Sequence, residues 1–484
     1  MQCVEDAALM AVMALQSLHW GARQGATVDV LFIRSISGAV GRGLLSSILR
    51  ASPIAWLKAR QWIRVLAPLR PRAAYRSRSW AHPVGDLLDI ARAYGSWRRA
   101  RQMEGDFRVE IHGIEVGDLV VDSYLRFNPS PRFNAGDRFV WALIWQAYRD
   151  VRRARAYFAA RRPAIYLTTY TTYLEHGVAV RAALAAGVPV RAFGNLQVFG
   201  IPVTPKHPFH TTDTSRYARD FDALPDKDSA LKDAERGLEL RMSGGIDAAT
   251  AYMRASAYAP GDESVPDVRG AVVVFLHDFY DSPHVYPDLV FQDFWAWIVC
   301  TIETLESNGT AYYLKPHPNQ IALSEGVLAE LRSAFPLARF LSPRLTNVQL
   351  VRAGMLCGVT VYGTVAHELA YLGVPSIACA GHPHRAFDFC RTARSVEQYR
   401  VFLESPALHP ASADEMRRQA MAFYYMHNLH GSDELRALRG RFVAFWAASH
   451  DDATTPDRWW GALEQLAASP GFAMALPASR GFAA

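Results

Sequence analysis

Cysteine is scarce in this chain, which has five cysteines in 484 residues and no C-x-x-C pair. The five are Cys3, Cys300, Cys357, Cys379 and Cys390, and their spacing matches no metal-binding pattern. A scattered, odd-numbered set with mostly apolar neighbours is typical of buried, reduced thiols rather than of disulfides. We therefore expect buried free thiols, no metal ligands and no cofactor.

Long apolar runs are also missing. No stretch approaches the ~20 apolar residues that a membrane span needs. Residues 1–20 are apolar in part, but they carry Glu5 and Asp6 and lack the basic start of a secretory signal. We therefore expect a cytoplasmic protein, soluble or peripheral on the inner membrane.

The charge balance is basic, with a formal net charge of +6 at pH 7, and half of the residues are hydrophobic. Such a chain is globular, is long enough for two or three domains, and favours anionic partners. Arginine and tryptophan are interleaved in residues 50–105. This pattern suits either a basic helical face held against an anionic membrane surface or a solvated face. No nucleic-acid-binding module accompanies it, so we expect no nucleic-acid partner.

Strand and helix patterns predict an α/β protein with two Rossmann-like domains facing a central cleft, together with extra helices. Residues 1–265 are expected to form the first domain, on the acceptor side, with a basic helical insertion. Polar, proline-containing residues 205–265 would be an excursion and linker within that range. Residues 266–395 are expected to form the second domain, which binds the nucleotide sugar, and residues 396–484 to be helices that pack back across both domains.

Polar side chains gather where three apolar strands of the second domain end. The ten residues after the strand at 271–276 hold an unusual density of titratable groups, which a structural turn does not need. We expect five of them to line the donor sugar or the cleft: His277, Asp278, Asp281, Ser282 and His284.

The next strand ends in Lys-Pro-His-Pro-Asn, residues 315–319. Its two prolines fix the direction of His317. Lys315 offers a point charge and His317 a hydrogen-bond donor, and both suit a phosphate. Asn319 completes the predicted phosphate-binding loop.

A third loop opens a helix with Gly363 and Thr364. Gly363 would let backbone approach a ligand, and Thr364 would cap a helix whose N–H groups bind an anion. Glu368, one turn further, would either accept hydrogen bonds from a ribose diol or only complement the helix dipole. Because parallel strands end at one edge of a sheet, these three loops predict a nucleotide-phosphate site.

Residues 315–319 and 363–375 resemble the C-terminal half of bacterial capsule and surface-polysaccharide glycosyltransferases of the GT-B fold. The likeness is to the group that uses CMP-activated acidic sugars, the Kdo transferases and the bacterial sialyl- and polysialyltransferases. Residues 107–195 resemble this group loosely. The resemblance implies that the His-Pro motif at His317 and the turn at Gly363–Thr364 contact the donor phosphate.

The resemblance also implies an acidic catalytic base in the N-terminal domain, often in an acidic pair. No clear pair is present. The candidates are Glu175, which lies beside His176 in the expected loop after the strand at 164–168, and Asp122.

The implied function is inverting transfer of a sugar in capsular or lipopolysaccharide synthesis. The donor would be a CMP-activated acidic sugar such as Kdo or sialic acid, and the acceptor a glycan or glycolipid. Three alternatives stay open: an enzyme like UDP-N-acetylglucosamine 2-epimerase, a CDP-polyol phosphotransferase, and a non-catalytic polysaccharide-assembly protein.

Overall fold

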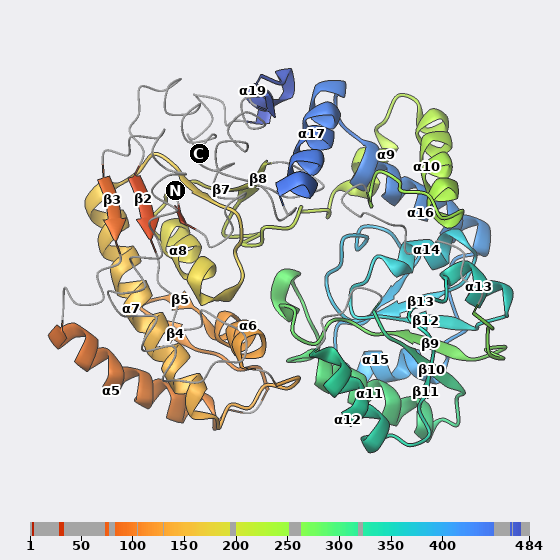
Figure 1. Ribbon diagram of the computed structural model, residues 1–484, viewed down its shortest axis with the longest axis horizontal. Helices are drawn as coiled ribbons and strands as arrows, with labels where there is room; N and C mark the ends of the chain where they lie inside the picture. Colours follow the sequence, from red (N-terminus) through yellow and green to blue (C-terminus); the bar gives the residue numbers. More distant parts are fainter. Residues whose placement is uncertain are drawn as a thin grey trace. The chain divides into compact units, whose positions relative to one another are not determined.

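The computed structural model describes residues 2–3, 29–32, 73–76, 83–103, 105–128, 130–193, 200–250, 263–317, 323–449, 465–466 and 468–475. The chain divides into two compact units, one made of Met1–Thr212 with Gly431–Ala484 and the other of Asp213–His430. Each unit contains helices and parallel strands (Figure 1), which confirms the α/β class. The predicted arrangement of two domains facing a cleft stays a prediction.

The second unit is built on a six-stranded sheet in which every pair of neighbouring strands is parallel. The spatial order is β11-β10-β9-β12-β13-β14. Its strands are β9 (Val272–Phe275), β10 (Tyr312–Lys315), β11 (Arg339–Phe340), β12 (Cys357–Val359), β13 (Ser376–Ala378) and β14 (Arg391–Thr392). The three apolar strands expected to precede the polar loops are confirmed as β9, β10 and β12, and β14 adds an edge that the sequence pattern did not reveal.

Helices cover both faces of this sheet (Figure 1). Val272 and Val274 point into a core shared with α11 (Phe294–Ser307), α12 (Ser324–Ala334) and α15 (Val396–Glu404). Val273 and Phe275 point into the opposite core, which includes α13 (Asn347–Arg352) and α14 (Val365–Tyr371). Alternate residues of β9 therefore serve opposite faces, which is why the strand reads as a continuous apolar run.

The described part of this unit includes further helical segments. They are α9 (Tyr217–Asp222), α10 (Lys227–Met242), α16 (Ala413–Tyr424) and the π-helical turn η3 (Tyr425–Leu429). Ala230, Ala234 and Leu238 form a buried stripe on α10 that shares a core with α16. The prediction that residues 205–265 form an excursion and linker is therefore wrong for α9 and α10, whose apolar stripe assigns them to the second unit. The unit limits at Thr212 and His430 also differ from the predicted limits at 265 and 395.

Three small sheets are present in the described part of the first unit. Its strands are β1 (Gln2–Cys3), β2 (Asp29–Phe32), β3 (Ala73–Arg76), β4 (Glu110–Ile111), β5 (Ile114–Glu115), β6 (Tyr166–Thr168), β7 (Val190–Phe193) and β8 (Gly200–Val203). The orders are β1-β2-β3, β4-β5 and β6-β7-β8, with β4-β5 and β7-β8 antiparallel. His112 and Gly113 form the two-residue turn of the β4–β5 hairpin. Their φ values are 53° and 78°, and the turn that best matches the twist of a hairpin has positive φ at both positions.

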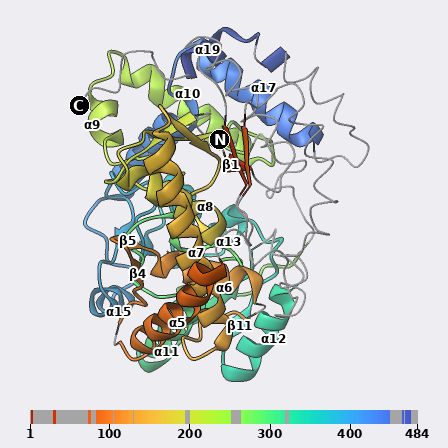
Figure 2. The ribbon, with the colours of Figure 1, turned by 90° about the vertical axis from the view of Figure 1, so that its left-hand side faces the viewer.

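The long helix α7 is the centre of helix packing in the first unit. The described helices of this unit are α5 (Pro83–Ala100), α6 (Gly117–Phe127), α7 (Arg138–Arg161), α8 (Tyr173–Ala185), α17 (Asp433–Ser449) and α19 (Pro470–Ala475). Asp137 caps α7 by accepting a hydrogen bond from the Phe139 amide. Helices α5, α6 and α8 lie against α7 (Figures 1 and 2).

Cys300, Cys357, Cys379 and Cys390 are free and buried, which confirms that prediction for the four thiols. Residues 1–20 lie outside the described residues except at β1. Of the Arg- and Trp-rich segment, β3, α5 and residues 101–103 and 105 are described, and its membrane contact stays a prediction. Among the helices of the described ranges, not one combines the length and hydropathy of a membrane-spanning segment.

Candidate active site

The central strand β9 is the switch point of the sheet in the second unit. The chain proceeds from β9 to β10 and β11 on one side, whereas β12, β13 and β14 follow one another on the other side. In open sheets of this kind, ligands bind in the crevice outside the carboxyl ends of the strands where the order reverses. The loops that follow β9, β10 and β12 leave the sheet at this edge.

His277 lies just beyond β9 among aromatic rings. Its ring centroid is 4.8 Å from that of Phe294, 4.7 Å from Tyr362 and 6.3 Å from His317. Its Nδ1 is buried and has no hydrogen-bond partner among the described residues. Burial lowers the pKa of His277 to about 4, so the imidazole is neutral at pH 7. A neutral ring with an unmet nitrogen is available to bind a ligand at this edge.

Lys315 ends β10, and His317 follows it on the same loop. Lys315 is buried, and its Nζ donates a hydrogen bond to the Pro343 carbonyl at 3.1 Å. Burial lowers the pKa of Lys315 to about 8, and the negative charge of Glu368 opposes part of this shift by raising the pKa. His317 is exposed at the surface. The protein atoms around its ring still remove part of its solvation, and this lowers its pKa. Asn319 lies outside the described residues.

The turn after β12 requires a glycine. The Gly363 amide donates to Thr360 Oγ1 at 3.1 Å, and a Cβ on Gly363 would stand 2.7 Å from the same oxygen. Tyr362 ties this turn to the loop after β9 by donating from its hydroxyl to the Ser282 carbonyl at 3.1 Å. Thr364 occupies the N-cap position of α14, but its side chain makes no capping hydrogen bond. The predicted capping role of Thr364 is therefore wrong, and its side chain is exposed.

Glu368 is held inside the second unit and does not present its carboxylate to a ligand. Its Oε1 accepts from Arg241 Nη1 at 2.7 Å, and its Oε2 accepts from Asn347 Nδ2 at 2.6 Å. Arg241 also pairs with Asp247 at 3.1 Å. Because both oxygens are engaged and the side chain is buried, the ribose contact considered for Glu368 is corrected to a structural role.

The five residues predicted from the loop after β9 divide by role. Asp278 Oδ1 accepts from the Tyr280 amide and from Ser324 Oγ, each at 3.1 Å, and so anchors the loop to α12. Ser282 is buried, and Asp281 Oδ1 accepts from its amide at 3.0 Å. The Asp281 charge raises the pKa of His277 against the larger effect of burial. His284 lies in the short 3-10 helix η2 (Pro283–Val285).

In the first unit, Glu175 and His176 lie in the first turn of α8 rather than in the expected loop, because this helix begins at Tyr173. His176 Nε2 is 3.3 Å from Glu175 Oε1, and the Glu175 side chain is 20% exposed. Asp122 lies on α6 and is 0% exposed. A fully buried carboxylate has no access to an acceptor hydroxyl, so Asp122 is wrong as the candidate base, and Glu175 remains.

A second carboxylate stands near Glu175 and was missed by the sequence analysis. Burial raises the pKa of Asp150 to about 6, opposed by Arg153 and Arg149, and the charge of Glu175 raises it further. Asp150 lies within the arginine-rich α7, where a lone acidic residue reads as part of a charged helix face. An acidic pair formed by residues on two helices leaves no local sequence pattern.

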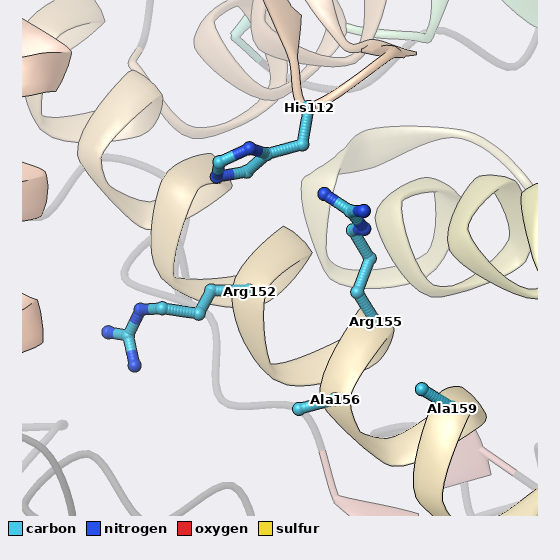
Figure 3. A pocket seen from close by; sticks show the side chains of 5 residues that line it. All are labelled: His112, Arg152, Arg155, Ala156 and Ala159. Carbon is cyan, nitrogen blue, oxygen red and sulfur yellow. The ribbon is translucent and has the colours of Figure 1, made fainter.

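A hollow on α7 is separate from these residues (Figure 3). It is lined by His112, Arg152, Arg155, Ala156 and Ala159. In Figure 3 the Arg152 guanidinium points away from His112 and Arg155, because it pairs with Asp86 at 2.6 Å and Asp89 at 2.9 Å. The hollow contains none of the predicted site residues.

One group in the described part of the chain has the donor atoms for a metal ion: His382, His384 and Cys390. It lies beyond β13, outside the loops predicted to bind the nucleotide. The spacing H-x-H followed by a cysteine six residues later resembles none of the common zinc patterns, so the sequence analysis did not select it.

No family model matches the sequence, and no curated protein matches it significantly. Similar solved structures include the KpsC beta Kdo 2,4 transferase of Thermosulfurimonas dismutans, at 15% identity over 53% of this chain and 78% of that chain, with a TM-score of 0.33. The UDP-GlcNAc 2-epimerase of Methanocaldococcus jannaschii is 10% identical over 62% of this chain and 93% of that chain, with a TM-score of 0.27. The glycotransferase of kitacinnamycin is 12% identical over 91% and 95%, with a TM-score of 0.24. At these TM-scores the similarities carry no argument about function.

Proposed function

We propose that the protein is a nucleotide-sugar-dependent glycosyltransferase of surface-polysaccharide synthesis. The observation that supports this most directly is the meeting of three loops at the switch point of the parallel sheet in the second unit. His277, His317, Lys315 and the Gly363–Thr364 turn belong to these loops. Open α/β sheets bind nucleotides at such a point.

The side chains at this edge suit a phosphate that becomes more negative during the reaction. Two neutral imidazoles supply hydrogen bonds, and Lys315 supplies a positive charge when it is protonated. Preorganised donors of this kind stabilise a leaving group whose charge grows in the transition state. The resemblance of residues 315–319 and 363–375 to transferases that use CMP-activated acidic sugars supports Kdo or sialic acid as the transferred sugar.

The proposed reaction is a single displacement with inversion. Glu175 removes the proton from an acceptor hydroxyl of a glycan or glycolipid. The acceptor oxygen bonds to the anomeric carbon as the bond from that carbon to the phosphate oxygen breaks, and CMP leaves. The exposure of Glu175 and the His176 nitrogen 3.3 Å from its Oε1 support this role for Glu175.

A nucleotide panel tests the proposal. Thermal unfolding would be followed with CMP, CDP, UDP and GMP for the native protein, for His317→Ala and for His430→Ala. His430 is an exposed histidine of the same unit outside the proposed site and serves as a matched control. CMP should stabilise the native protein and the control but not His317→Ala.

Stabilisation by UDP alone would favour an epimerase of UDP-N-acetylglucosamine, and stabilisation by CDP alone a polyol phosphotransferase. If no nucleotide stabilised the protein, the proposed phosphate site would be refuted. Release of CMP from a CMP-sugar only in the presence of a glycan acceptor would then separate a transferase from a hydrolase.

A further inference from the structure

A group of three potential metal ligands lies at the end of the sheet in the second unit. His382 and His384 belong to the loop that follows β13, and Cys390 directly precedes β14. The three side chains are nearly fully buried, at 1%, 0% and 6% exposed. One ligand atom from each lies within 4.8 Å of the others.

The histidine nitrogens in this group are not satisfied by protein. His384 has no hydrogen-bond partner for either ring nitrogen among the described residues, and His382 has none for Nδ1. The two rings are stacked with centroids 3.5 Å apart, and Phe389 stacks on His384 at 5.0 Å. Buried polar groups without partners cost free energy, and native proteins rarely keep them without a reason. A bound cation would supply such a reason.

His382 is also held by a neighbouring side chain. His382 Nε2 and Thr392 Oγ1 are 2.5 Å apart. This contact fixes the ring, as the outer partner of a metal-bound histidine does, and leaves Nδ1 without a partner among the described residues.

We propose that His382, His384 and Cys390 bind a zinc ion that braces this end of the sheet. Two imidazoles and one thiolate would fill three of the four positions of tetrahedral Zn²⁺, and a water molecule would take the fourth. Tetrahedral zinc brings nitrogen and sulfur ligands to roughly 3.3–3.6 Å from one another, so binding draws the three atoms closer than in the metal-free arrangement. Zn²⁺ displaces the thiol proton of Cys390, which is released to solvent.

The burial of all three ligands assigns this ion a structural role. The metal would join the β13 loop to β14, and the β13 loop contacts the segment that follows η2. Gly381 donates its amide to the Pro287 carbonyl at 2.7 Å, and Val290 donates to the Cys379 carbonyl at 3.0 Å. The nearby cation Arg385 lies 3.6 Å from Asp288, which offsets part of its repulsion of a metal.

The test begins with protein purified without a polyhistidine tag and analysed for bound metal by inductively coupled plasma mass spectrometry. Cys390→Ala is the test variant, and Cys379→Ala is its control because it removes another buried thiol from the same loop. We expect about one zinc per chain in the native protein and in Cys379→Ala, and a loss of at least tenfold in Cys390→Ala.

Replacement of zinc by Co²⁺ gives a second readout that needs no variant to fold. Native protein loaded with Co²⁺ should show a thiolate-to-cobalt charge-transfer band in the near ultraviolet and d–d bands of a tetrahedral ion in the visible. A chelator should remove both bands and lower the unfolding temperature. Native protein that takes up neither Zn²⁺ nor Co²⁺ in equilibrium dialysis would overturn the proposal, and so would a charge-transfer band that persists in Cys390→Ala.

Discussion

The lowered pKa of Lys315 predicts that nucleotide affinity depends on pH in an unusual range. Lys315 is buried at the end of β10 with its Nζ bonded to the Pro343 carbonyl, and burial lowers its pKa to about 8. An ordinary lysine stays charged to about pH 10. The amine of Lys315 in the free protein therefore changes charge around pH 8, a range in which binding can be measured in ordinary buffers.

The size of the effect follows from this pKa. About nine-tenths of Lys315 is cationic at pH 7 and about one-tenth at pH 9. A nucleoside monophosphate is a dianion over this whole range, since its second pKa is about 6, and the neighbouring His277 and His317 remain neutral because their pKa values are lowered. If only the cationic amine binds the phosphate, the association constant falls ~10-fold from pH 7 to pH 9, or ~1.4 kcal/mol. Affinity is therefore near its maximum at pH 7 and is lost as the pH rises through the pKa of Lys315.

Calorimetric titration with CMP at pH 7, 8 and 9 and constant ionic strength would measure this slope. At pH 8 the complex should also take up about half a proton, which appears as a dependence of the binding enthalpy on the buffer. Lys315→Arg is the control, because a guanidinium keeps its charge at all three values and should flatten the profile. A flat profile in the native protein, or an equal slope in Lys315→Arg, would refute the role assigned to Lys315.

Three other substitutions test the remaining assignments. His317→Ala should lower turnover with a CMP-sugar by ~10²-fold, the scale of one lost oxyanion donor, and near-normal turnover would remove His317 from the site. Glu175→Gln should keep its CMP affinity in calorimetry but lose ~10²–10⁴-fold in transfer, so a fully active variant would exclude Glu175 as the base. Glu368→Ala should lower the free energy of unfolding in urea by ~3 kcal/mol, because Arg241, 4% exposed at its side chain, loses a buried carboxylate partner. A loss below ~1 kcal/mol would contradict the burial of this pair.

The sheet of the second unit was predictable because its strands are apolar runs that end in polar loops. A strand such as β9 is buried on both faces, so its sequence is continuously hydrophobic and the next polar residue, His277, marks where it ends. The ends of two helices are equally local features, because each is followed by Gly-Val-Pro, at 187–189 and 373–375. Gly187 and Gly373 have positive φ values of 71° and 80°, which glycine adopts at a helix end without strain. Signals of this kind need only a few neighbouring residues.

Contacts between distant residues could not be predicted in this way. Arg241 and Glu368 are 127 residues apart, and nothing near Glu368 in the sequence indicates that a buried guanidinium from α10 will reach it. The assignment of Asp122 as a candidate base was wrong for a related reason. A carboxylate on an apolar helix reads as a functional group, and only the packing of α6 shows that this one is fully buried.

The electrostatics of the sheet edge favour hydrogen bonding over permanent charge as the means of holding a nucleotide phosphate. With the pKa values of His277 and His317 lowered, both rings are neutral at pH 7 and can act as N–H donors. Fixed positive charges would bind the dianion of the released nucleotide as tightly as the charge that develops during bond cleavage, and tight product binding does not raise turnover. Neutral donors with one titratable amine bind the product less strongly, yet still stabilise the phosphate oxygen as its charge grows. The proposed site should therefore release CMP faster as the pH rises through the pKa of Lys315, and a stopped-flow measurement of CMP dissociation that showed no acceleration between pH 7 and pH 9 would contradict this.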